Sequence, residues 1–215
     1  MSASKIGMWL FWSLIAVASV YFYLDNAVAY LFGYRSPRFG STLLSNQLWF
    51  VLHILAASLP FWLGPTQFSK TIRARYPRYH RIAGRLYVGG VLIAGLMSLK
   101  LSTLSDCFGC RVPLATLSIV WLLLTGAAFA AILARNFLVH RHFMILSYTC
   151  TLAFVTIRLI YELPESWFGF IESNEVRRTN FEWLCWVVPL VFAEIFIIGI
   201  PAIKQQRAKQ ARAGG

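Results

Sequence analysis

Charged side chains are scarce in this sequence. Asp, Glu, Lys and Arg make up 13% of its 215 residues, about half of the roughly 25% that is usual in a soluble domain, and 58% of the residues are hydrophobic. A soluble globule of this size could neither bury so much apolar surface nor cover itself with so few charges. A disordered chain is excluded as well, because disordered chains are poor in apolar and aromatic residues. The composition therefore predicts an integral membrane protein.

The motifs of soluble group-transfer enzymes are also missing. The sequence has no phosphate-binding glycine loop, no nucleophile elbow and no metalloprotease helix motif. The two cysteines outside the apolar stretches are too few for a zinc site. The net charge of +12 would suit nucleic acid, but no compact soluble domain presents it. We therefore assign no catalytic residue, no metal site and no nucleic-acid partner, and whether the protein is an enzyme stays open.

Long apolar stretches dominate the chain. Each has about 18 to 23 residues, which is enough to cross a hydrocarbon core of about 30 Å as a helix. Helices are expected because every backbone N–H and C=O in lipid must be paired within its own segment. The sequence predicts an all-α fold, a six-helix transmembrane bundle in which residues 1–215 form one integral membrane domain. The predicted spans are about 6–24, 47–64, 82–101, 112–133, 143–161 and 181–203.

The charges are divided unevenly between the two ends of such a bundle. With six spans, both termini and the loops at 65–81 and 134–142 lie on one side, and these segments contain basic residues but no Asp or Glu. The positive-inside rule places that side, and with it both termini, in the cytoplasm. Membrane lipids are the expected partners of these cations, and a bacterial inner (plasma) membrane is the expected location.

Ionisable side chains inside the spans are the first places to look for function, because they are costly in a bilayer. His53 lies about two turns into the second span, and Arg158 lies about one turn from the outer end of the fifth. We predict that both face the bundle interior and share a buried polar site, with Glu162 or Glu182 neutralising the arginine. The alternative is an Arg158 side chain that extends outward to the lipid headgroups.

Glu194 lies near the middle of the sixth predicted span and is assigned to the same buried polar site. A carboxylate at that depth is a candidate proton relay. The alternative is a structural carboxyl that is protonated or hydrogen-bonded to a neighbouring helix. Tyr148 and Thr151 of the fifth span are its candidate partners.

The histidines suggest a cofactor. His80, His140 and His142 lie at the cytoplasmic ends of the third and fifth spans, and two imidazoles that face each other across a bundle suit a b-type haem as axial ligands. A quinone among the histidines is one alternative, and interfacial histidines that contact lipid headgroups or loops are another. The candidate cofactor-binding residues are the four histidines and three arginines that would pair with haem propionates: His53, His80, His140, His142, Arg81, Arg85 and Arg141.

Cys107 and Cys110 form a C-x-x-C motif in the short outer loop. A disulfide that staples this loop is the first interpretation, because the outer side of a bacterial membrane is oxidising. A redox-active pair and a free or metal-binding pair are the alternatives. Cys150 and Cys185 fall inside spans and are expected to be small, buried apolar residues.

Three short motifs occur in order along the chain. They are His53 in a span that ends Gly64-Pro65-x-Gln67-Phe68, then Arg78-x-His80-Arg81-x-x-Gly84-Arg85-x-Tyr87, and then His140-Arg141-x-x-Met144 followed by Tyr148 and Val155-Thr156-x-Arg158. With these motifs the chain resembles a bacterial family of predicted multi-pass membrane proteins catalogued as a domain of unknown function. The resemblance implies no activity, and it assigns to the family's pattern His53, His80, Gly84, Arg85, His140, Arg141 and Arg158. Six helices with scattered histidines are more loosely similar to cytochrome b561-type bundles.

Two functional hypotheses follow. The first is a redox module of the inner membrane that holds haem b or a quinone among its histidines. The second is a non-enzymatic protein that binds or transports a small ligand, or an accessory subunit of a larger complex with other membrane subunits as partners. The absence of group-transfer motifs and the polar pair of His53 and Arg158 motivate the second hypothesis.

Overall fold

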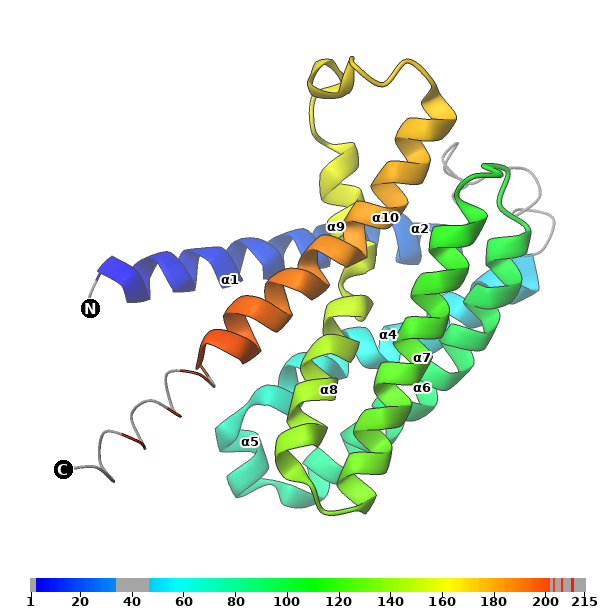
Figure 1. Cartoon of the computed structure of the whole chain (residues 1–215). Helices are drawn as coiled ribbons and strands as arrows, with labels where there is room; N and C mark the ends of the chain where they lie inside the picture. Colours follow the sequence, from blue (N-terminus) through cyan, green and yellow to red (C-terminus); the bar gives the residue numbers. More distant parts are fainter. Residues whose placement is uncertain (1–2, 34–46, 202, 204–205, 207–209, 211–215) are drawn as a thin grey trace.

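Every regular element is a helix in the computed structural model, which describes residues 3–33, 47–201, 203, 206 and 210 (Figure 1). Six helical segments are long and apolar enough to span a membrane. They are Ser13–Leu31, Gln47–Phe68, Pro77–Thr103, Arg111–Leu133, Phe137–Tyr161 and Asn174–Gly199. The predicted all-α class and the six spans are confirmed.

The N-terminal helix continues past the residues that the sequence places at its end. The continuous segment consists of α1 (Ala3–Phe22), the π-helix η1 (Tyr23–Val28) and α2 (Ala29–Leu31). Asp25 and Asn26 lie within η1, where the side-chain amide of Asn26 donates a hydrogen bond of 3.1 Å to the carbonyl oxygen of Phe22. Because Asn26 finds this partner inside the helix, its polarity does not end the span. The helix ends at Leu31 rather than at residue 24.

Two prolines interrupt the hydrogen bonds of α4 (Gln47–Phe68) without ending it. The sequence predicts that the second span stops before Pro65, but the helix runs on to Phe68. A proline at position 65 cannot donate to the carbonyl oxygen of Phe61, four residues earlier. The hydroxyl group of Tyr148 donates to that oxygen instead, at 3.4 Å. A side chain from a neighbouring helix thus replaces the missing backbone donor, as membrane helices require.

The backbones of α4 and α6 (Pro77–Thr103) approach closely at Gly90. A Cβ atom at this position would lie 2.8 Å from the carbonyl oxygen of Ala56 and 2.8 Å from Cδ of Pro60. Pro60 also leaves the Ala56 carbonyl without its usual helical donor. Only glycine fits here without moving one helix away from the other.

A chain of hydroxyl groups joins α6 to α7 (Arg111–Leu133) and α8 (Phe137–Thr151) in the middle of the bundle. Tyr87 is fully buried, and its hydroxyl group lies 2.8 Å from Oγ of Ser147. Ser147 Oγ in turn lies 2.6 Å from Oγ1 of Thr125, which donates to the carbonyl oxygen of Trp121 at 2.8 Å. Since each hydroxyl has one proton, the bonds run in one direction, from Tyr87 through Ser147 and Thr125 to Trp121.

The last two spans are composite. The fifth consists of α8 and α9 (Ala153–Tyr161), and the sixth of α10 (Asn174–Phe192) and the π-helix η3 (Ala193–Gly199). Between them lies the 3₁₀-helix η2 (Glu165–Phe168). Asn136 and Ser173 cap α8 and α10, accepting hydrogen bonds from the backbone N–H groups of Val139 and Val176. These caps explain why both helices begin before the predicted apolar stretches at 143 and 181.

α5 (Lys70–Arg75) lies at the lower end of the bundle in Figure 1, and the sixth span runs from the upper end toward the lower left. The loop between α6 and α7 and the loop that contains η2 lie at the other end. The cytoplasmic location of the α5 end stays a prediction based on charge.

Candidate functional site

A cavity of about 300 Å³ lies inside the bundle, between η1, α4, α6, α7, α8, α9 and α10. Most of its wall is apolar and includes the rings of Phe50, Phe61, Trp121 and Phe154. Sites for small molecules are typically mostly apolar cavities of about 300–1,000 Å³ with a few well-placed polar groups. The ionisable side chains in this wall are His53, Arg158 and Glu182. They make this cavity the candidate functional site.

The orientation of His53 on α4 is fixed by a hydrogen bond across the helix interface. Its Nδ1 atom lies 2.9 Å from the carbonyl oxygen of Ala94 on α6. A carbonyl oxygen can only accept, so this contact assigns the proton to Nδ1. In the neutral imidazole, Nε2 is then a hydrogen-bond acceptor. Nε2 of His53 can therefore accept a hydrogen bond from a hydroxyl group of a ligand.

Arg158 on α9 and Glu182 on α10 supply the charges of the cavity wall. The guanidinium carbon of Arg158 lies 5.5 Å from the centre of the Phe154 ring, within the range of a cation–π contact. Glu182 interacts electrostatically with Arg158 and also with Arg178. Glu182 thus interacts with one arginine in the cavity wall, Arg158, and with one outside it, Arg178.

Two of the predicted carboxylates do not line the cavity. Glu162 is exposed at the C-terminal end of α9 and is not part of the cavity wall. Glu194 is 51% exposed in η3, and its Oε2 atom lies 3.0 Å from Nε2 of His142. His142 lies near the start of α8, so this contact places Glu194 beside the start of the fifth span.

The two hydroxyl groups expected to hold Glu194 are occupied elsewhere. Tyr148 donates to the carbonyl oxygen of Phe61, and Thr151 donates to that of Ser147 at 3.2 Å. The assignment of Glu194 to the buried polar site is therefore corrected: this carboxylate pairs with His142 at the α5 end of the bundle.

The other histidines lie away from the cavity. His53 is the only histidine among the described residues that line it. His80 interacts electrostatically with His140, whose Nδ1 atom bonds to the carbonyl oxygen of Ala128 at 2.8 Å. Nδ1 of His80 is buried and has no hydrogen-bond partner among the described residues. The arginines assigned to haem propionates are all exposed near this pair: Arg81, Arg85 and Arg141.

The C-x-x-C loop is closed and docked on another helix. Cys107 and Cys110 form a disulfide, and both are buried at 3% and 2% exposure. The backbone N–H of Gly109 donates to Oε1 of Glu175 at 2.9 Å. The loop between α6 and α7 is thereby fastened to the start of α10. This geometry suits a structural staple better than a reactive pair, because a redox-active cysteine must be accessible.

Residues 50–197 match a family model described as "Predicted membrane protein (DUF2306)", which is more than half of the chain. The chain belongs to this family. No curated protein and no solved structure matches the chain, so the likeness to cytochrome b561-type bundles is not confirmed. The matched region of this DUF2306 protein contains His53, Arg158 and Glu182. The N-terminal helix lies outside it, yet contributes Tyr23, Asn26 and Ala27 to the cavity wall.

Several polar residues of the DUF2306 cavity were missed at the level of sequence. Asn26, Ser98 and Ser118 all line it, and the hydroxyl groups of the two serines lie 2.6 Å apart. The sequence feature that could have indicated them is the presence of small polar side chains inside apolar stretches. In spans as rich in serine and threonine as these, the sequence alone does not show which of them face one another.

Proposed function

We propose that this DUF2306 protein binds a small membrane-soluble molecule with an apolar body and a hydroxyl-bearing head, of the quinol class. The observation that supports the proposal is the meeting of His53, Arg158 and Glu182 in one mostly apolar cavity. Ionisable groups are costly in a membrane, so their convergence on a cavity favours a ligand. A location in the bacterial inner membrane, where quinols are dissolved, belongs to the same proposal.

The polar groups of the cavity complement such a head. Nε2 of His53 accepts the hydrogen bond of a hydroxyl group, because Nδ1 is already bonded to Ala94. Arg158 donates to a second oxygen atom, and Glu182 balances its charge. The aromatic walls accommodate an apolar ring and tail. Quinol oxidation would in addition need an electron acceptor, so the proposal concerns binding.

Equilibrium dialysis of the purified protein in detergent against decylubiquinol tests the proposal. We expect saturable binding. Replacing His53 with Leu removes the acceptor, and loss of one hydrogen bond worth about 1.5 kcal/mol weakens binding about tenfold. His142→Leu is the matched control, because it removes a histidine outside the cavity wall. Absence of saturable binding to the wild type, or equal binding by the folded His53→Leu variant, refutes the proposal.

Haem is a second candidate ligand, at the other end of the bundle. The Nδ1 bond from His140 to Ala128 leaves its Nε2 atom for a metal, an arrangement typical of histidine ligands, and His80 lies close by. Haem at this pair would supply one-electron chemistry. A Soret band from protein purified from haem-replete cells would support this candidate, and a colourless preparation would remove it.

A further inference from the structure

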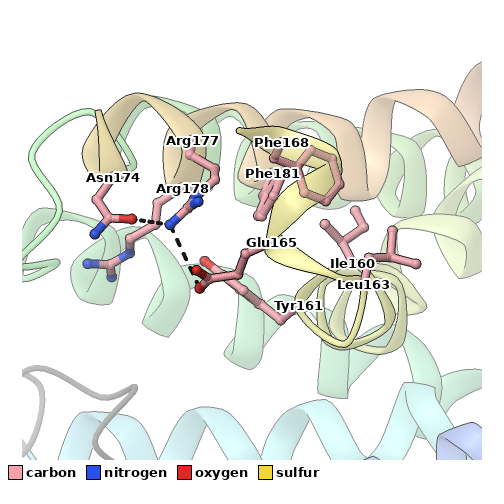
Figure 2. Close-up of a pocket in the computed structure, with 9 residues that line it drawn as sticks. All are labelled: Ile160, Tyr161, Leu163, Glu165, Phe168, Asn174, Arg177, Arg178 and Phe181. Carbon is pink, nitrogen blue, oxygen red and sulfur yellow. Dashed lines mark hydrogen bonds and ion pairs between the residues drawn. The ribbon is translucent and has the colours of Figure 1, made fainter. Parts of the chain in front are cut away.

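A second cavity, of about 260 Å³, lies at the end of the bundle opposite α5. It is enclosed by the end of α9, the loop with η2 and the start of α10 (Figure 2). Among the described residues, none lines both this outer pocket and the cavity around His53. The residues of the outer pocket are Ile160, Tyr161, Leu163, Glu165, Phe168, Asn174, Arg177, Arg178 and Phe181.

One side of the outer pocket is apolar and firmly packed. The rings of Phe168 and Phe181 meet edge to face with centroids 4.7 Å apart, and Tyr161 packs on Phe181 at 5.6 Å. Ile160 and Leu163 continue this surface (Figure 2). Such a wall is suited to hold an apolar or aromatic group.

The other side of the outer pocket is cationic. Arg177 and Arg178 line it together, against the single carboxylate of Glu165. Figure 2 shows Arg177 held between Asn174 and Glu165. Arg178 interacts electrostatically with Glu182 and Tyr161. The lining residues therefore carry two positive charges and one negative charge, an excess of positive charge beside an apolar wall.

The carboxylate of Glu165 is a weak competitor for Arg177. It lies 3.8 Å from the arginine nitrogen, and its side chain is 88% exposed, whereas that of Arg177 is 19% exposed. Charge-assisted hydrogen bonds are about 2.7–2.9 Å long, and exposed ion pairs contribute little stability. An oxyanion that enters the pocket can bond Arg177 at the shorter distance and displace Glu165 into solvent.

We propose that the outer pocket binds an oxyanion, a phosphate or a carboxylate, joined to an apolar group. Arginine favours this chemistry because its planar guanidinium group pairs with two oxygen atoms at once. The apolar group rests against Phe168 and Phe181. Both a free organic anion and the headgroup region of an anionic lipid have this chemistry, and both can reach the outer end of the bundle.

The experiment measures thermal stabilisation of the full chain by phenyl phosphate in a zwitterionic detergent. We expect a saturable rise in Tm, with inorganic phosphate binding more weakly because it lacks the apolar group. Arg177→Gln and Arg178→Gln each weaken the binding of phenyl phosphate about tenfold, since each removes a charge-assisted contact. Lys70→Gln, which removes a cation from α5 at the other end, leaves binding unchanged. His53→Leu also leaves it unchanged, which separates this site from the cavity.

A second experiment, in lipid discs, distinguishes an anionic lipid from a free organic anion as the ligand. If the ligand is a lipid, discs of phosphatidylglycerol raise the Tm above that in phosphatidylcholine, Arg177→Gln removes the difference, and phenyl phosphate competes. If it is a free anion, phenyl phosphate binds and the two lipids give equal Tm. Should phenyl phosphate and phosphatidylglycerol both fail to stabilise the wild type, or should folded Arg177→Gln respond like the wild type, the proposal is overturned.

Discussion

Replacing Gly90 with Ala tests the close approach of α4 and α6. The new Cβ atom would lie 2.8 Å from the Ala56 carbonyl oxygen and 2.9 Å from Cβ of Leu59, well inside van der Waals contact. Neither is the flexible end of a side chain, so α4 must move away from α6. Overpacking of this kind costs about 1–3 kcal/mol. For a chain of about 200 residues this lowers the Tm by about 2–12 °C.

The neighbouring glycine provides a matched control. A Cβ atom at Gly89 meets nothing within 4 Å, although the residue lies in the same helix and the same substitution is made. Gly89→Ala is therefore expected to leave the Tm unchanged or to raise it slightly, because alanine favours the helix. Thermal unfolding of both variants in one detergent measures the difference.

Gly90→Ala is also expected to affect the cavity around His53. Gly90 lies one turn before Ala94, whose carbonyl oxygen holds His53. Separation of the two helices lengthens this hydrogen bond, so Gly90→Ala should weaken decylubiquinol binding while Gly89→Ala should not. Equal Tm values for the two variants, or a lower one for Gly89→Ala, would refute the packing argument.

Two further predictions concern the core and the orientation of the bundle. Ser147→Ala breaks the hydroxyl chain in its middle and should cost up to about 1.7 kcal/mol. Tyr87→Phe removes the first donor of the chain, which also lies 3.3 Å from Oγ1 of Thr151, and should cost about 0.6 kcal/mol. Thermal unfolding of each variant measures these losses. Equal losses would contradict the larger cost expected at Ser147. Cysteines introduced at Lys70 and at Glu172 should react with a membrane-impermeant maleimide from opposite sides, with Glu172→Cys labelled from outside. Labelling of both from the same side would overturn the topology.

The number of spans was predictable from sequence, whereas several of their ends were not. Apolar length reports the part of a helix that crosses hydrocarbon, but helices continue into polar ends that hydropathy does not register. Asn136 and Ser173 carried the available signal, since both residue types cap helices. Asn26 misleads in the opposite direction. In the sequence a polar residue there predicts the end of the helix, but its side chain bonds within the helix, which continues.

Depth in the membrane was a partial guide to the site. Polarity and depth single out His53 and Arg158, and the structure places both on one cavity. Depth does not give the rotation of a helix about its axis, which decides that Glu182 faces this cavity while Glu162 does not. Depth also does not predict that Glu194 meets His142, because that contact depends on which face of the sixth span is turned toward α8.

The disulfide in the loop between α6 and α7 has a consequence for cell biology. Cytosolic glutathione and thioredoxin keep thiols reduced, so a disulfide of this kind persists on the side of a membrane that they do not reach. Persistence of the Cys107–Cys110 bond in cells would therefore indicate that this loop lies on the oxidising side and α5 on the reducing side. The positive-inside rule predicts the same orientation from the arginines, so two kinds of unrelated chemistry lead to one testable topology.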